Sequence, residues 1–144
     1  MDRHPQKDEL LIGGADGVPK IYQMLRTQDR KIGDDYNLIK AYEATPGRIY
    51  DVDFNADGSR FVVASSLDGT GEVRLYETGN DKLLRKFEGQ QGAVYCVSFN
   101  GAGNVVASAG FDGLVRLNDV ETGKLVKEFS PVPEGATEVA AAGN

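Results

Sequence analysis

Short apolar segments and glycine-containing turns alternate along most of the chain. In Val-Arg-Leu-Tyr, residues 73–76, apolar and polar positions alternate, which is the period of two expected for a strand with two different faces. Glycine follows Asp or Asn between such segments and supplies the positive φ that tight hairpin turns require. The pattern predicts an all-β chain of short antiparallel strands.

The same order of segments occurs twice at nearly one spacing. Phe54 precedes Phe99 by 45 residues, and Asp68-Gly69 precedes Asp112-Gly113 by 44. Each unit contains four short strands separated by Asn-x-x-Gly, Asp-Gly and Thr-Gly turns. Four antiparallel strands in roughly 40–45 residues is the size of one β-propeller blade. The spacing therefore predicts successive blades.

A third, earlier unit is partial. Residues 9–14, 18–22 and 37–42 match the second, third and fourth strands, with about nine residues inserted near 25–33. The first strand would precede His4, where only three residues remain, so we expect eleven strands. The prediction is an all-β partial β-propeller of about three four-stranded antiparallel blades, the first lacking its first strand. The blades span about 4–43, 45–88 and 90–131 within a domain of residues 1–131, followed by a flexible Ala-rich tail at 132–144.

Over about residues 4–131, these features resemble the WD-repeat family, whose blades carry Gly-His before the first strand, Asp-Gly after the second and Trp-Asp at the end of the third. Asp-Gly is kept in all three units. Ser108 fits the serine of the family's Asp–His–Ser–Trp hydrogen-bond network, which is incomplete in every blade here. Replacements stand at the other signature places: Tyr22-Gln23, Tyr76-Glu77 and Asn118-Asp119 for Trp-Asp, and Gly89-Gln90 and Ala44 for Gly-His.

The resemblance also implies a binding face. Partners of the family often dock where the second-to-third strand turns and the entries to the first strands meet. Tyr and Arg are common among residues that dominate interfaces, and a large aromatic in a turn, such as Phe111, calls for an explanation. The alternative is that Tyr50 and Tyr95 fill space between blades. The matching positions, and hence the predicted partner-binding residues, are Arg48, Tyr50, Leu67, Tyr95 and Phe111, together with Ala15.

Composition narrows the classes of partner. The formal net charge is −6, and an acidic surface repels phosphate backbones, so we expect no nucleic-acid binding. No segment approaches the roughly 20 apolar residues that span a membrane, and the polar N-terminal residues lack a signal-peptide pattern. We expect no membrane partner and a cytoplasmic location. Cys96, the single cysteine, lies in an apolar run, where we expect it to pack.

No catalytic, cofactor-binding or metal site is predicted. Asp68 and Asp112 recur at one position of successive blades, which indicates turn capping rather than acid–base chemistry. His4, the only histidine, has no partner for a catalytic triad. Residues 53–58 match the first half of an EF-hand loop, but Arg60 and Ala64 occupy positions 8 and 12, so we expect a hairpin turn.

The sequence leaves two interpretations of function open. The leading interpretation is a non-catalytic scaffold that binds a protein or peptide; the alternative is a propeller segment of a larger enzyme whose catalytic groups lie elsewhere. Eleven strands cannot close a ring of about 4–8 blades, so two blade faces are expected to be open. Either the chain is part of a longer propeller, or two copies pair into a six-bladed ring, with residues 137–140 supplying the missing strand.

Overall fold

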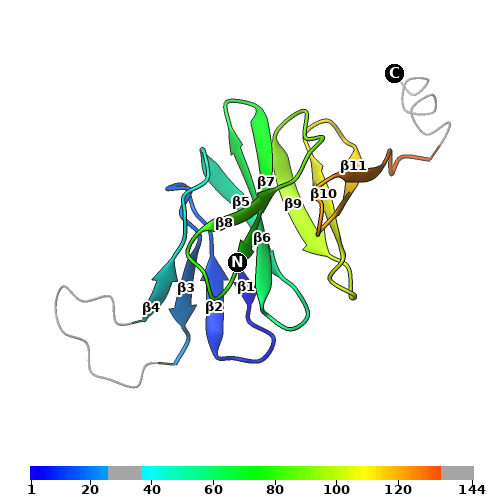
Figure 1. Cartoon of the computed structure of the whole chain (residues 1–144). Helices are drawn as coiled ribbons and strands as arrows, with labels where there is room; N and C mark the ends of the chain where they lie inside the picture. Colours follow the sequence, from blue (N-terminus) through cyan, green and yellow to red (C-terminus); the bar gives the residue numbers. More distant parts are fainter. Residues whose placement is uncertain (26–36, 134–144) are drawn as a thin grey trace.

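The computed structural model describes residues 1–25 and 37–133, which form three four-stranded antiparallel sheets side by side (Figure 1). In each sheet the strands lie in chain order, as expected for propeller blades. Within the described ranges, no helix has the length and apolar character needed to cross a membrane. Blade 1 contains β1 (Asp2–Arg3), β2 (Glu9–Ile12), β3 (Lys20–Gln23) and β4 (Leu38–Ala41); blade 2 contains β5 (Arg48–Phe54), β6 (Arg60–Leu67), β7 (Thr70–Glu77) and β8 (Leu83–Lys86); blade 3 contains β9 (Val94–Phe99), β10 (Val105–Gly110), β11 (Val115–Asp119) and β12 (Leu125–Phe129).

The all-β fold of three blades is confirmed, but the expected absence of the first strand of blade 1 is wrong. Asp2 and Arg3 pair with Leu11 and Leu10 to form β1, so the described residues contain twelve strands. A strand of two residues shows no periodicity of its own. It is held by its pairing with β2 and by the hydrogen bond from the His4 amide to the Glu9 carbonyl, 2.9 Å.

The hydrophobic core lies between blades rather than within one. The first interface joins blades 1 and 2, where Leu11 and Ile21 pack with Phe61 and Tyr76 of the next blade. The second joins blades 2 and 3, where Val62 and Leu75 face Val94 and Val106. Alternate residues of β6 and β7 therefore serve two cores, which is why these strands are buried on both faces. The interior of β6, residues 61–64, is accordingly apolar throughout, whereas β7 keeps its alternation and buries Arg74 and Tyr76 as well as the apolar positions.

The Asp-Gly turns differ between blades. Asp112 Oδ1 accepts a hydrogen bond from the Leu114 amide at 3.1 Å, and Asp16 Oδ1 accepts one from the Val18 amide at 3.2 Å. The predicted turn capping is therefore confirmed for Asp112, and Asp16 caps its turn in the same way. Asp68 departs from the expectation: with Gly69 it makes a two-residue hairpin in which Asp68 has φ 50°, so β6 and β7 extend farther than their counterparts.

Other expectations have different outcomes. Cys96 does not pack into a core, because its side chain is exposed on the outward side of blade 3. Most of the predicted insertion near 25–33, and the strand suggested for 137–140, lie outside the described residues. The 1–131 and 132–144 boundaries remain predictions.

Candidate functional site

Two tyrosines stand at equivalent positions of adjacent blades and touch. In blade 2, Ile49 pairs with Ser65 and Asp51 with Ala64, which leaves Tyr50 as the extra residue of a β-bulge. In blade 3, Tyr95 is the extra residue between Val94 and Cys96. Bulges turn a side chain out of the regular alternation. The rings meet edge to face, with centroids 5.1 Å apart, while Tyr50 stays 48% and Tyr95 44% exposed.

These tyrosines belong to a surface that we call the upper face, the end of the blades carrying the turns between their second and third strands (upper end in Figure 1). Leu67 ends β6 on this face and is 52% exposed. Phe111, just after β10, is 79% exposed and makes no ring contact with another described aromatic. Arg48 begins β5 beside Ser66 and forms no ion pair with the described part of the chain. The structure thus places these five predicted residues at one end, and Ala15 lies in the turn between β2 and β3 at the same end of blade 1. Of the six, only Tyr50 and Tyr95 are in mutual ring contact.

Part of the expected polar network is present in blade 3. Gln90, at the histidine position, donates from Nε2 to Ser108 Oγ at 3.0 Å. Asn118, at the tryptophan position, donates to the Glu88 carbonyl at 2.8 Å, and Tyr76 donates in the same way to the Glu43 carbonyl at 2.8 Å. The Tyr76 and Asn118 bonds each tie a third strand to the linker that precedes its own blade, and the Gln90 bond ties the second strand of blade 3 to the same linker.

A buried arginine lies below the turn in blades 2 and 3. Arg116 contacts Asp112 at 2.6 Å and Glu128 at 2.8 Å, although its side chain is only 3% exposed. The Arg116 guanidinium lowers the pKa of Asp112 below its ordinary value. In blade 2, where the hairpin carries Asp68 away, Arg74 pairs instead with Glu72 at 2.7 Å.

Carboxylates join the innermost strands of successive blades. Asp53 Oδ2 accepts a hydrogen bond from the Phe99 amide at 2.6 Å, and Asp2 Oδ2 accepts one from the Phe54 amide at 2.8 Å. Asp51 Oδ2 accepts another from the Val97 amide at 3.0 Å. Burial raises the pKa of Asp53, and the nearby negative charges of Asp2 and Asp51 raise it further, against the lowering effect of its hydrogen bonds. The first half of the EF-hand-like motif is thus used in blade joining and in a hairpin turn.

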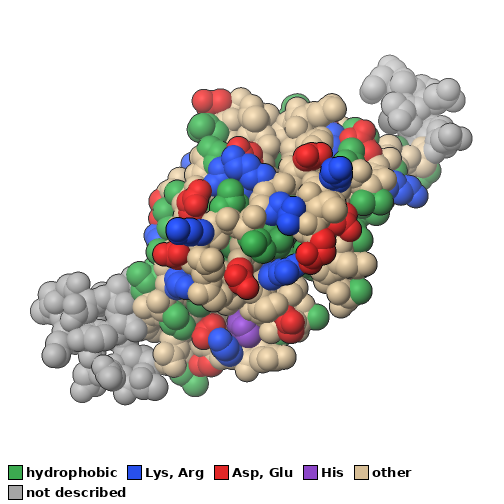
Figure 2. Space-filling view, in the orientation of Figure 1, with side chains coloured by type: hydrophobic (Ala, Val, Ile, Leu, Met, Phe, Trp, Pro, Cys, Tyr) green, Lys and Arg blue, Asp and Glu red, His purple; other side chains and the backbone are tan. Residues whose placement is uncertain are grey.

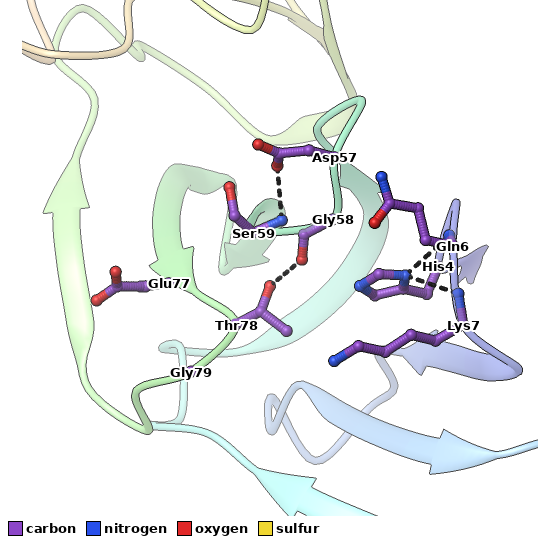
Figure 3. A pocket seen from close by; sticks show the side chains of 9 residues that line it. All are labelled: His4, Gln6, Lys7, Asp57, Gly58, Ser59, Glu77, Thr78 and Gly79. Carbon is purple, nitrogen blue, oxygen red and sulfur yellow. Dashed lines mark hydrogen bonds between the residues drawn. The ribbon is translucent and has the colours of Figure 1, made fainter.

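His4 lies at the opposite end of the blades, in the wall of a cavity of about 310 Å³ formed by three turns (Figure 3). It is only 4% exposed and packs edge to face on Phe54. Its Nδ1 accepts hydrogen bonds from the amides of Gln6 and Lys7, both 3.1 Å, so the proton of the neutral ring is on Nε2. Figure 3 shows the ring directed toward Gly58. His4 therefore caps a turn and fills a blade junction.

Charges of both signs are mixed on the face of the molecule that Figure 2 shows. Figure 2 shows Lys and Arg side chains interspersed with Asp and Glu over the visible face. Within residues 1–25 and 37–133, no group of three or more His, Cys, Asp or Glu side chains is placed to hold a metal ion. The upper face does carry large exposed apolar side chains, with Leu67 52% and Phe111 79% exposed.

Several of these features were missed by sequence reasoning. The bulges depend on strand register, and the partners of Asp51 and Asp53 are 46 residues away. One signal was available: Tyr50 and Tyr95 interrupt the alternation at the same place in two repeats. Had the interruption been read as an extra residue, it would have suggested a shared bulge.

Comparison with known families agrees with this architecture. The family model described as "WD domain, G-beta repeat" matches residues 36–72 and 81–119, just over half of the chain. The chain belongs to the WD-repeat family. Each matched WD repeat extends from the fourth strand of one blade into the third strand of the next. One sequence repeat thus contributes to two blades, which makes the junctions part of the repeat itself.

Named relatives are longer than this WD-repeat chain. It is 32% identical over 132 residues to the human angio-associated migratory cell protein, covering 91% of this chain but 28% of that protein. It is 36% identical over 90 residues to the WD repeat-containing protein 55 homolog of Drosophila persimilis, covering 61% of this chain and 17% of that protein. The periodic tryptophan protein 2 homolog of Schizosaccharomyces pombe is 26% identical over 105 residues, covering 73% of this chain and 12% of that protein. WD-repeat proteins typically act as protein-interaction scaffolds.

Proposed function

We propose that this chain is a non-catalytic scaffold that binds a protein or peptide on its upper face. The observation that carries the proposal is the pair of bulged tyrosines, Tyr50 and Tyr95. Their rings hold each other in place, yet about half of each remains exposed. A partner can therefore bury aromatic area against side chains that are already ordered, which lowers the entropic cost of binding.

The neighbouring residues extend this surface. Leu67 and Phe111 add exposed apolar area, and Arg48 adds a cation without an ion-pair partner in the described structure. Tyr and Arg are enriched among the residues that dominate interfaces. The net charge of −6 is the reason for proposing a protein or peptide rather than a nucleic acid.

Association through the outward blade faces is a second candidate. It is favoured by the part-exposed apolar side chains of blade 3 around Cys96, Ala107 and Val115, which line a cavity of about 250 Å³. Exposed apolar surface of this kind marks interaction sites in soluble proteins. The activity and partners of a longer protein containing this segment would be set by regions beyond these blades as well.

Peptide selection tests the leading proposal. A random-peptide phage library would be selected on the wild-type chain, and the enriched peptides titrated against wild type, Tyr50→Ala, Tyr95→Ala and Leu84→Ala by fluorescence polarisation. We expect each tyrosine substitution to weaken binding about tenfold or more, which corresponds to about 1.4 kcal/mol. Leu84 is 44% exposed on β8, away from the upper face, and should be neutral. Equal affinity for wild type and both tyrosine variants would contradict the proposal.

A further inference from the structure

The outward side of blade 3 carries the same pattern of side chains as the side of blade 2 that is buried against blade 3. Pairing places Leu117 opposite Ala107, as Leu75 lies opposite Val62, and Val115 opposite Ala109, as Val73 lies opposite Ala64. Leu75 and Val73 are each 1% exposed because blade 3 covers them, whereas Leu117 and Val115 are only half-buried. Phe129 likewise stands where Phe87 stands, and is 40% exposed against 6%. We call this side, comprising Cys96, Ser98, Ala107, Ala109, Val115, Leu117 and Phe129, the open face of blade 3.

Blade 1 lies at the other end of the array (Figure 1). Its outward side carries the same pattern of side chains as the side of blade 2 that packs against blade 1. Leu10 pairs with Tyr22 as Phe61 pairs with Tyr76, and Ile12 pairs with Lys20 as Val63 pairs with Arg74. The side chains also correspond in chemical type. Leu10 and Ile12 match the apolar Phe61 and Val63, Tyr22 matches Tyr76, and Lys20 matches the cation Arg74. Tyr22, Lys20 and Ile12 also line a cavity of about 330 Å³. We call the side formed by Leu10, Ile12, Lys20 and Tyr22 the open face of blade 1.

The hydrogen bonds of the internal joints extend the match. Tyr76 and Asn118 donate to the carbonyls of Glu43 and Glu88, which follow the fourth strands of the preceding blades. Tyr22 holds the tyrosine position in blade 1. Ser130 follows Phe129 as Glu88 follows Phe87. A blade 1 seated on blade 3 would thus place the Tyr22 hydroxyl at the Ser130 carbonyl.

The inner strands of blades 3 and 1 are also compatible with such a joint between two copies. In each internal joint, a carboxylate of one blade accepts a hydrogen bond from a backbone amide of the next blade. The donor is the Phe54 amide between blades 1 and 2 and the Phe99 amide between blades 2 and 3. Blade 3 has Ser98 in place of that carboxylate. Arg3 takes the place of Phe54 in blade 1, and its amide already donates to Asp2 Oδ1 at 2.8 Å. Blade 3 thus offers no carboxylate to the inner strand of a following blade. Blade 1 does not need one, because its Arg3 amide already has an acceptor in Asp2.

We propose that the open face of blade 3 binds the open face of blade 1 in a second copy of this chain. The joint is head-to-tail, and two copies make it twice. A head-to-tail contact forms a ring when its rotation closes, and six blades lie within the range of about 4–8 in which propellers close. The inference goes beyond peptide binding and does not involve the upper face.

Light scattering coupled to size-exclusion chromatography tests the proposal on the full chain. We expect a mass of twice the 15.5 kDa of one chain at micromolar concentration. Leu117→Glu and Ile12→Lys, on opposite open faces, should each give folded monomers. An equimolar mixture should restore the dimer, because it contains one unaltered joint and one in which the two introduced side chains carry opposite charges. Leu84→Glu, on an exposed position of β8, is the matched control and should remain dimeric.

Four outcomes would overturn the proposal. Wild type could be monomeric throughout the concentration range, as expected if only further blades of a longer chain cover these faces. Assemblies that grow beyond two copies would exclude the closed ring. A dimer broken by Leu117→Glu but not by Ile12→Lys would indicate a symmetric contact between two copies of blade 3. Finally, two variants that are folded by circular dichroism but fail to associate on mixing would exclude the head-to-tail joint. Peptide titrations of the Tyr50 and Tyr95 variants report on the upper face independently of all four.

Discussion

Asp53 Oδ2 lies 2.6 Å from the amide nitrogen of Phe99, and this hydrogen bond joins the innermost strands of blades 2 and 3. The Asp2–Phe54 bond repeats the arrangement between blades 1 and 2. An inner strand has an unpaired edge whose amides need acceptors. In this chain, the acceptors are carboxylates of the preceding blade.

Asp53→Ala should therefore destabilise the fold. The substitution leaves the Phe99 amide without its acceptor in a part-buried joint, which should lower the free energy of unfolding by about 1–2 kcal/mol. Asp53→Asn retains an acceptor oxygen and should cost much less. Urea unfolding monitored by circular dichroism measures both. If Asp53→Asn lost as much free energy of unfolding as Asp53→Ala, the charge of Asp53, and not its hydrogen bond, would be what stabilises the joint.

The raised pKa of Asp53 also predicts a pH dependence. Because the folded state holds this proton more tightly than the unfolded state, its contribution to stability is complete below the ordinary Asp pKa. It is lost as pH rises through the higher pKa of the folded state. The free energy of unfolding of Asp53→Asn, relative to wild type, should thus improve as pH rises across that window. A constant difference between the two proteins would contradict this prediction.

The pairing of Asp112 with Arg116 predicts the opposite trend. The pKa of Asp112 is lowered, chiefly by its hydrogen bond with Arg116, so its contribution is present above the ordinary Asp pKa and lost as pH falls through the lowered value. Asp112→Asn should cost about 1–3 kcal/mol at neutral pH, because the buried guanidinium loses one of its two anionic partners. Asp68→Asn is the matched control, since Asn tolerates the positive φ of that turn. Thermal unfolding compares the two variants, and similar losses of stability at both sites would rule out a special role for the Asp112–Arg116 pair.

A pair of glycine substitutions isolates the His4 junction. A Cβ at Gly58 would meet His4 Nε2, whereas a Cβ at Gly113 would meet nothing within 4 Å. The two residues have φ of 72° and 74°, so the backbone strain on substitution by Ala should be similar, about 1 kcal/mol. Gly58→Ala should therefore cost more than Gly113→Ala in urea unfolding. His4→Ala in the Gly58→Ala background should remove the steric part of the difference; equal losses for the two glycines would contradict the close contact.

The number and type of blades could be predicted because the turn glycines and aspartates recur at the spacing of one four-stranded blade, as Asp68-Gly69 and Asp112-Gly113 do. Phe111 and the tyrosines could also be assigned to one face, since strand ends of a repeat share an end of the blade. Three features could not be predicted. The strand at Asp2–Arg3 is too short to have a pattern, the bulge at Tyr50 depends on pairing with β6, and the burial of His4 depends on a glycine more than fifty residues away. In each case, the deciding contact is with a strand or turn that local periodicity does not describe.

The most direct measurement of the scaffold proposal is an NMR titration of the ¹⁵N-labelled chain with a selected peptide. The account predicts amide shift changes concentrated at Arg48, Tyr50, Leu67, Tyr95 and Phe111, with loss of these changes in the Tyr50→Ala/Tyr95→Ala double variant. Shift changes centred instead on Ser98, Ala107 and Leu117, or on the turns around His4, would contradict binding at the upper face.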